Sequence, residues 1–249
     1  MIRRQEDAVT NNVGQGRPLQ RMFSEVPRRY DLINRLFTLR FDEKWRRMAA
    51  AECLKGSAAR ILDLCTGTGD LAFRLADGAG AQSLIFGMDF SMPMLEVACV
   101  KTARRGASIG FIAGDAAKLP FRDNTFDVIG TAFAFRNLTY RNPGRDRYLS
   151  EILRVLAPGG KFVVVESSQP RLRIVRAAVH WYMKAAVSFT GGLISGQRGA
   201  YRYLAHSAIN FYNPDELADL LRSAGFSRVE YRMLLGGVAA IHVVWKQSG

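Results

Sequence analysis

The ten residues Ile61–Asp70, with the sequence ILDLCTGTGD, constrain the fold more than any other part of the chain. An apolar run of strand length leads into Gly67 and Gly69, and a helical pattern starts near Asp70. A buried strand, a glycine turn and a helix in this order form the first β-turn-α unit of a nucleotide-binding α/β domain. The stretch therefore predicts a parallel sheet with a ligand bound at this turn.

The glycine turn by itself allows two cofactors. Residues 67–72 satisfy the dinucleotide fingerprint G-x-G-x-x-A, so NAD must be considered. A diphosphate would bind at the helix N-terminus, where the carboxylate of Asp70 would repel it. S-adenosylmethionine has a sulfonium and an ammonium group but no phosphate, and acidic residues suit it. We therefore expect S-adenosylmethionine, held by Asp63, Gly67, Thr68, Gly69 and Asp70.

Strand and helix patterns alternate after this turn and change near the C-terminal end. Strands are expected at 61–65, 83–88, 109–113, 126–131, 161–166, 226–234 and 238–245, and helices at 70–77, 92–104, 145–156 and 214–223. Ala157–Gly160 is expected to end a helix, and Gly236–Gly237 to form a tight hairpin turn. The prediction is an α/β fold: a mostly parallel seven-stranded sheet with a C-terminal antiparallel hairpin and helices on both faces. This is the Rossmann-like architecture of class I methyltransferases that use S-adenosylmethionine.

Length and composition favour one domain. The 249 residues are 48% hydrophobic, enough for a full core. We expect a mobile arm at 1–18 and a single domain at 19–249, with N-terminal helices at about 20–54 and an inserted cap at about 171–211. No apolar run is long enough to span a membrane. Three cysteines without metal-like spacing indicate reduced thiols, a cytoplasmic protein and no metal.

The net charge of +13 is partly local. No Asp or Glu occurs from Ser167 to Asn213, a stretch that holds several Arg and Lys residues. Nucleic acid, an anionic membrane surface and an acidic substrate are candidate partners, and an excess kept for solubility is the alternative. Because the excess is concentrated in one stretch, a functional surface is favoured.

Two further acidic residues follow predicted strands. Asp89, followed by Phe90, ends the second strand, where a carboxylate can accept hydrogen bonds from both ribose hydroxyls. Asp115, followed by Ala116, closes the third strand, where an acceptor can meet the adenine amino group. The alternatives are an N-cap for Asp89 and a turn residue for Asp115. The carboxyl ends of parallel strands lie along one edge of the sheet. We therefore expect Asp89, Phe90, Asp115 and Ala116 around one crevice, as cofactor contacts.

The chain from about Phe23 to Lys246 resembles the ubiquinone/menaquinone biosynthesis C-methyltransferase family. The Arg136-Asn137 pair and the Tyr-x-Tyr-Leu block at 201–204 are much more specific to that family than the glycine turn. The stretches that carry the resemblance are Phe23–Asn34, the glycine turn, Leu119–Asp127, Phe135–Thr139, Arg154–Gly160, Tyr201–Leu204, Ser207 and Phe211.

The resemblance implies methyl transfer from S-adenosylmethionine to a ring carbon of a prenylated quinol. Conversion of demethylmenaquinol to menaquinol, or the equivalent ubiquinone step, is expected. Three stretches depart from the family: Ala132–Phe135, Gln197–Gly199 and Phe211–Tyr212. A serine contact to the cofactor is lost at Ala132, which leaves a backbone contact there. These departures border the acceptor site, so they affect the substrate assignment more than the reaction type.

The chemistry also points to particular side chains. A quinol ring becomes nucleophilic at carbon when a hydroxyl ionises, so the enzyme must stabilise a phenolate. Arg136 is a permanent cation that lowers a nearby hydroxyl's pKa, and Asn137 can orient Arg136 or the ring oxygen. Tyr30, Tyr201 and His206 can donate hydrogen bonds or relay the proton. The alternative for Arg136 is a surface salt bridge, and packing is the alternative for the tyrosines and His206. The expected catalytic residues are Arg136, Asn137 and Tyr201, and the expected substrate contacts are Tyr30, Phe133, Phe135, Tyr203 and His206.

Other function classes remain open at this point. A nucleic-acid methyltransferase fits the pI near 10.2, but the Asn/Asp-Pro-Pro-Tyr signature is missing. Another small-molecule or lipid acceptor, or a non-catalytic protein of the same fold, is also possible. We expect a prenylated quinol as partner and no nucleic acid, while the ring type, tail length and oligomeric state stay open.

The predicted cap contains one amphipathic helix. Leu172, Val175, Val179, Tyr182, Met183 and Ala186 share an apolar face, and Arg173, Arg176, His180 and Lys184 share a basic one. Such a helix, with an amphipathic Trp181, suits a lipid–water boundary, and an ordinary packed helix is the alternative. We expect it to take the prenyl tail and to contact the anionic inner face of the membrane transiently.

Overall fold

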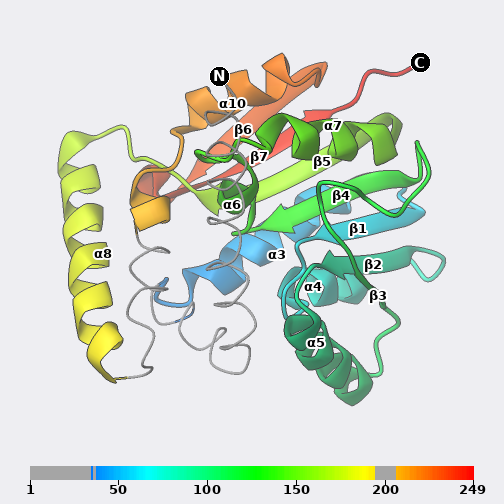
Figure 1. The fold of residues 1–249 in the computed structure, drawn as a ribbon, viewed down its shortest axis with the longest axis horizontal. Coiled ribbons are helices and arrows are strands. Elements are labelled where there is room, and N and C mark those ends of the chain that lie inside the picture. Colours follow the sequence, from blue (N-terminus) through cyan, green and yellow to red (C-terminus); the bar gives the residue numbers. More distant parts are fainter. Residues whose placement is uncertain (1–34, 36–37, 194–205) are drawn as a thin grey trace, which may run out of the picture.

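The computed structural model describes residue 35 and residues 38–193 and 206–249, with the side chains of 186–193 excepted. Seven strands form one sheet in the order β3-β2-β1-β4-β5-β7-β6 (Figure 1). β7 is antiparallel to both of its neighbours, β5 and β6, and the other described pairs are parallel. The strands are β1 Arg60–Leu64, β2 Leu84–Asp89, β3 Gly110–Ala113, β4 Phe126–Ala132, β5 Leu156–Ser167, β6 Arg228–Leu234 and β7 Ala239–Trp245. The predicted α/β fold is confirmed.

Helices cover both faces of the sheet. α3 and α4 pack on one face through an apolar cluster that includes Trp45, Leu71 and Leu75. α7 and α10 pack on the other face, through Ile152 and Leu217. The helices are α3 Phe41–Cys53, α4 Asp70–Gly78, α5 Met92–Arg105, α6 Phe135–Thr139, α7 Arg145–Val155, α8 Arg173–Leu193 and α10 Pro214–Ser223.

Most of the predicted boundaries agree with the structure within two residues, and β5 is the main exception. It starts at Leu156, directly after α7, where Ala157–Gly160 was expected to form a connection. Leu156 pairs with Phe126 before the register shifts. A Cβ atom on Gly160 would lie 2.9 Å from the carbonyl oxygen of Asp127, so the two backbones approach closely there. The Pro-Gly-Gly sequence therefore forms an irregularity inside the strand.

The hairpin between β6 and β7 also differs from the prediction. A two-residue turn at Gly236–Gly237 was expected, but a short 3₁₀ turn, η1 Leu235–Gly237, joins the strands. Leu235, Gly236 and Gly237 all have positive φ angles, of 45°, 65° and 97°. Two glycines in this turn carry the left-handed backbone at low cost. Of the N-terminal helices predicted at about 20–54, α3 is observed, while the predicted arm at 1–18 and most of residues 20–38 lie outside the described residues.

His242 joins β7 to the start of α10. Its buried Nε2 donates a hydrogen bond of 2.9 Å to the carbonyl oxygen of Pro214, which fixes the neutral tautomer with Nε2 protonated. Nδ1 is buried and has no hydrogen-bond partner within the described residues. Burial lowers the pKa of His242 to about 4. The imidazole is therefore neutral in the folded protein at pH values where the unfolded chain would protonate it.

This burial predicts a loss of stability in weak acid. Between pH 7.5 and pH 5 the unfolded chain gains a proton on His242 that the folded chain does not, so folding weakens as the pH falls. We expect His242 to account for about 2 kcal/mol of that loss, from a pKa near 6.5 in the unfolded state. His242→Gln keeps a donor toward Pro214 and should lose correspondingly less stability in urea titrations at the two pH values. An equal pH dependence in both proteins would contradict the assignment.

Candidate active site

The glycine turn between β1 and α4 has the backbone that the sequence predicts. Gly67 and Gly69 have φ angles of 55° and 87°, in the left-handed region that favours glycine. A Cβ atom on Gly69 would lie 3.0 Å from the ring of Phe73, whereas one on Gly67 would point into open space. The turn therefore packs tightly on the α4 side and leaves its outer backbone open to a ligand.

Asp63 braces this turn from inside. Its buried carboxylate accepts hydrogen bonds from Thr66 Oγ1 at 2.6 Å and from the Ala72 amide at 2.9 Å. Burial raises the pKa of Asp63 to about 7, against the lowering effect of these two hydrogen bonds. The structure thus gives Asp63, predicted as a cofactor contact, an observed role in holding the turn in shape.

Asp89 connects the turn to the helix that follows β2. One carboxylate oxygen accepts a hydrogen bond of 2.8 Å from the Gly67 amide, and the other accepts one of 2.9 Å from the Ser91 amide. Burial raises the pKa of Asp89 above its usual range, although both hydrogen bonds oppose this. Each carboxylate oxygen can accept more than one hydrogen bond, so the site has acceptor capacity for ribose hydroxyls. Phe90, which follows, is exposed.

Lys101 on α5 is a member of this site that the sequence did not indicate. Its ammonium donates hydrogen bonds of 2.9 Å to Thr68 Oγ1 and to Asp70 Oδ1. Burial opposes the ionisation of Asp70, but the charges of Arg46 and Lys101 outweigh it and hold the pKa of Asp70 below its usual range. Asp70 is therefore ionised, as expected. The ammonium of Lys101, however, offsets part of the repulsion that Asp70 would exert on a diphosphate.

Three further predicted cofactor contacts lie at or just beyond the carboxyl ends of their strands. Asp115 is exposed and accepts a hydrogen bond of 2.8 Å from the Ala117 amide, as the turn alternative expects. Ala116 is buried next to it, and Ala132 is the last residue of β4. These positions agree with a site along one edge of the sheet, and their contact with a cofactor stays a prediction.

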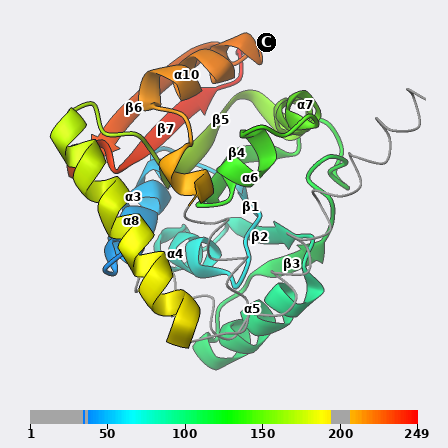
Figure 2. The ribbon, with the colours of Figure 1, turned by 60° about the vertical axis from the view of Figure 1, so that its left-hand side comes forward.

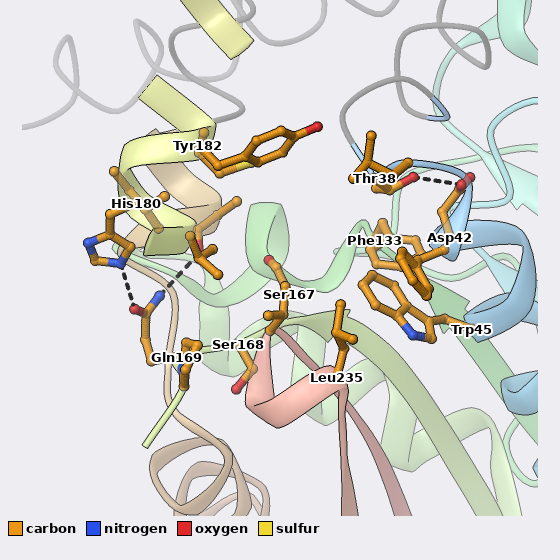
Figure 3. Close-up of a pocket in the computed structure, with 18 of the residues that line it drawn as sticks. Thr38, Asp42, Trp45, Phe133, Ser167, Ser168, Gln169, His180, Tyr182 and Leu235 are labelled. Carbon is orange, nitrogen blue, oxygen red and sulfur yellow. Dashed lines mark hydrogen bonds between the residues drawn. The ribbon is translucent and has the colours of Figure 1, made fainter. Parts of the chain in front are cut away.

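A cavity of about 380 Å³ lies between the start of α3, the ends of β4 and β5, and α8 (Figure 3). Its wall is mostly apolar, with Trp45, Phe133, Tyr182 and Leu235 among the lining side chains. The polar side chains that line it are those of Thr38, Asp42, Arg46, Arg136, Ser167, Ser168, Gln169, His180 and Tyr182. A space of this size and character suits a largely apolar ligand that carries a few polar groups.

Arg136 borders this cavity and is held by a buried carboxylate. Nη1 donates hydrogen bonds of 2.6 Å to Glu166 Oε1 and 3.0 Å to the carbonyl oxygen of Phe133, and Nε donates one of 3.2 Å to Ser207 Oγ. Glu166 also accepts a hydrogen bond of 2.8 Å from the Ser167 amide. Arg136 thus forms a salt bridge, but it is buried at the cavity wall and is not the surface salt bridge of the alternative.

The other predicted acceptor residues differ in their positions. Phe133 lines the cavity in a left-handed conformation with a φ of 59°. The Oδ1 atom of Asn137 is buried and has no hydrogen-bond partner in the part of the chain that the structure describes. Phe135 is 0% exposed and packs on Phe162 in the core, so it offers no surface to a substrate. His206 is exposed and is not among the residues that line this cavity.

Tyr30, Tyr201 and Tyr203 lie outside the described residues. In the described residues no group of three or more His, Cys, Asp or Glu side chains could hold a metal ion.

Sequence reasoning missed two charged parts of the site: Glu166, which holds Arg136, and the pair Asp42 and Arg46 in the cavity wall. Glu166 carried a usable signal, because it is a lone acidic residue at the end of the apolar strand Phe162–Val165. Asp42 and Arg46 are spaced four apart in a predicted helix, where such a pair usually means a solvated face. Both are buried instead. Gln169 and His180, joined by a hydrogen bond of 3.1 Å, gave no signal at all.

Several solved structures with a similar fold are described as methyltransferases, and one is a [4+2]-cyclase. A SAM-dependent methyltransferase from Thermotoga maritima superposes with a TM-score of 0.61 at 20% identity, over 91% of this chain and 100% of that one. One from Aquifex aeolicus gives a TM-score of 0.56 at 19% identity, over 80% and 88% of the two chains. At these identities the comparison establishes the fold alone.

Sequence comparisons are more specific. The demethylmenaquinone methyltransferase of Thermus thermophilus is 45% identical over 222 residues, which cover 89% of this chain and 98% of that protein. The ubiquinone/menaquinone biosynthesis C-methyltransferase UbiE of Desulfotalea psychrophila is 36% identical, over 92% and 91% of the two chains. The model of the ubiE/COQ5 methyltransferase family matches residues 10–246. This chain, an S-adenosylmethionine-dependent methyltransferase, therefore belongs to the ubiE/COQ5 methyltransferase family.

Proposed function

We propose that this enzyme transfers a methyl group from S-adenosylmethionine to a ring carbon of a prenylated quinol, as in the conversion of demethylmenaquinol to menaquinol or the equivalent ubiquinone step. The observation that carries the proposal is a buried guanidinium, Arg136, in the wall of a largely apolar cavity. Such a wall matches an acceptor that is apolar apart from its ring oxygens. The names of the relatives agree with this acceptor.

The glycine turn fits the donor. The open backbone at Gly67, the carboxylate of Asp89 and the exposed ring of Phe90 lie at or just beyond the carboxyl edge of β1 and β2. We propose that Asp89 accepts hydrogen bonds from the ribose, that Asp115 receives the adenine amino group, and that Thr68 and Asp70 lie against the amino-acid part. When bound, S-adenosylmethionine supplies an electrophilic methyl group.

Arg136 acts on the acceptor in this proposal. A cation beside a ring hydroxyl lowers its pKa, and the resulting phenolate makes the neighbouring ring carbon nucleophilic. Glu166 and the carbonyl oxygen of Phe133 fix the guanidinium in place before the ring arrives, so the stabilising charge is preorganised. Asn137, next in the chain, orients Arg136 or a ring oxygen, and Tyr201 and Tyr30 assist as hydrogen-bond partners.

The proposed reaction releases one proton. A carbon–carbon bond forms to the ring as the carbon–sulfur bond breaks, and the substituted carbon then loses its hydrogen as a proton to restore the aromatic ring. Water or a side chain at the cavity wall accepts it. A nucleic-acid acceptor is not favoured, because a base with its phosphates would be poorly matched to an apolar wall of this extent.

Removing the carboxylate of Asp89 should weaken the donor site. Asp89→Asn keeps the shape but loses the negative charge, and we expect S-adenosylmethionine to bind about 10- to 100-fold more weakly, the usual effect of a lost charged hydrogen bond. Calorimetric titration measures this. Glu96→Gln removes an exposed carboxylate from α5, the helix that follows Asp89 in the chain, and should leave the affinity unchanged. Tight binding of NAD without a response to S-adenosylmethionine would overturn the cofactor assignment.

Arg136 should affect turnover more than donor binding. Arg136→Lys keeps the charge but loses the planar fork, and we expect turnover to fall about 10²- to 10³-fold with the donor affinity nearly intact. Loss of the guanidinium alone would leave Glu166 as an unpaired buried charge and destabilise the fold. The control is therefore Arg136→Met combined with Glu166→Gln, which removes both charges. A folded double variant with wild-type turnover would show that Arg136 is structural.

We further propose that the outer side of α8 contacts an anionic membrane surface. The structure corrects the sequence assignment of its faces: Val179, Tyr182 and Met183 line the cavity, and His180, expected on the basic face, lines it too. The opposite side carries Ile174 and Trp181, which are 84% and 74% exposed. No helix within the described residues is long and apolar enough to cross a membrane.

In Figures 1 and 2, α8 runs as one long helix outside the layered body of the protein. A prenylated acceptor must leave a bilayer to be methylated, and a helix with one side on the cavity and an apolar, basic outer side suits that transfer. Exposed Arg173 and Lys184 flank the apolar residues on this side. Each such cation near an anionic surface adds about 1 kcal/mol of attraction.

Vesicle sedimentation tests this surface. Ile174→Ser with Trp181→Ser should reduce binding to anionic vesicles at least tenfold, because the exposed apolar contacts are lost. Arg173→Glu with Lys184→Glu should abolish the preference for anionic over neutral vesicles. Val100→Ser, which removes an exposed apolar residue on α5, serves as the control and should bind as the wild type does. Equal binding of all four proteins would rule out the surface.

A further inference from the structure

The acceptor cavity contains a second guanidinium. Arg46 of α3 lines the same cavity as Arg136 and is 8% exposed. Its Nη1 atom lies 2.5 Å from Asp42 Oδ2 in the helical turn before it, and Thr38 Oγ1 donates a hydrogen bond of 2.7 Å to Asp42 Oδ1. Figure 3 shows Thr38 and Asp42 together on the wall beside Trp45 and Phe133. The carboxylate of Asp42 thus fixes Arg46, and Thr38 in turn fixes Asp42 by its hydrogen bond.

Phe133 contacts both guanidinium groups. The carbonyl oxygen of Phe133 accepts a hydrogen bond from Arg136, while Cζ of Arg46 lies 5.0 Å from the centre of its ring. The left-handed backbone of this non-glycine residue, with a φ of 59°, sends the carbonyl and the ring to these two partners. A conformation of this kind costs free energy and is concentrated at functional sites.

A buried pair such as Arg46–Asp42 is not explained by stability. The cost of removing two charges from water commonly offsets their attraction, and apolar replacements of similar volume are often as stable. Packing of this helix face against Trp45 and Phe133 would not require a buried ion pair. In an apolar cavity, a fixed guanidinium instead offers directed donors to an oxygen of a ligand.

Geometry places Arg46 near both substrates, because it lines the acceptor cavity and its helix, α3, packs on α4, which begins at the glycine turn. The charge of Arg46 lowers the pKa of Asp70 and of Asp63, in each case after the larger effect of burial. Both carboxylates belong to the glycine turn that we assign to the donor. Arg46 therefore stands where the donor site and the acceptor cavity adjoin, the place at which a ring has to lie for methyl transfer.

We propose that Arg46 binds the second oxygen of the acceptor ring and makes the enzyme select rings with two oxygens on opposite sides. Arg136 acts on the hydroxyl next to the reacting carbon, and Arg46 holds the hydroxyl across the ring. The inference rests on the proposed function, since it requires an acceptor of the quinol type. A ring with a single hydroxyl is still nucleophilic beside that hydroxyl, but it has no second oxygen for Arg46 to bind.

Two matched acceptors test the proposal. One is a 1,4-naphthoquinol with a short prenyl chain and an empty ring carbon beside one hydroxyl, and the other is the same molecule without the hydroxyl across the ring. For the wild type we expect kcat/KM to favour the quinol by about 10- to 100-fold, the effect of one charged hydrogen bond. Arg46→Met should bring this ratio close to one, mainly by a loss on the quinol. The ratio, taken at saturating donor, cancels any change in donor binding.

Control variants separate selection from folding. Arg47→Met removes the same charge from an exposed neighbour on α3 and should keep the wild-type ratio. Asp42→Asn leaves Arg46 without its anchor and should lower the ratio, and Arg46→Lys should retain part of it. A ratio unchanged in Arg46→Met and Asp42→Asn, with both acceptors losing equally, would make the pair structural. A wild type that methylates neither acceptor would overturn the proposed function itself.

Discussion

The buried carboxylate of Glu166 is the interaction on which the acceptor side of the molecule depends. It follows the apolar run Phe162–Val165 near the end of the central strand β5, and it binds both the side chain and the backbone amide of Arg136. The strand end and the first turn of α6 are thereby joined in one geometry. Through Arg136 the connection extends to Ser207, which comes shortly before α10 in the sequence. One carboxylate thus sets the positions of several parts of the cavity wall.

The fold could be predicted because its signals are local. Each strand of the parallel part is an apolar run bounded by turn residues, and each helix that follows has an apolar face of period 3.6. The errors arose where the pairing of distant residues decides the outcome. Leu156 extends β5 because Phe126 is available as a partner, and no property of Ala157–Gly160 itself indicates this. The hairpin turn likewise took a longer form than its two glycines suggested.

The site could be predicted in part, for the same reason. Asp89 and Arg136 follow strands, so their place at the carboxyl edge follows from topology. Lys101 and Arg46 lie within helices, and only the packing of those helices brings them to the glycine turn and the cavity. Phe135 was expected to contact the substrate, and it lies two residues from Phe133 in the sequence. The turn of α6 directs its side chain into the core instead. Proximity in sequence to a functional residue does not fix the direction of a side chain.

The place of β7 between β5 and β6 also limits the order in which the protein can be completed during synthesis. β6 leaves the ribosome before β7, but its partner in the sheet does not yet exist, and the edge of β5 stays open until Ala239–Trp245 emerges. Val238 and Leu235, which line the cavity, lie in the connection to this strand. Domains fold as the chain emerges from its N-terminal side. The donor half of the molecule can therefore form on the ribosome well before the acceptor cavity has all its walls, and a nascent chain would expose apolar surface there.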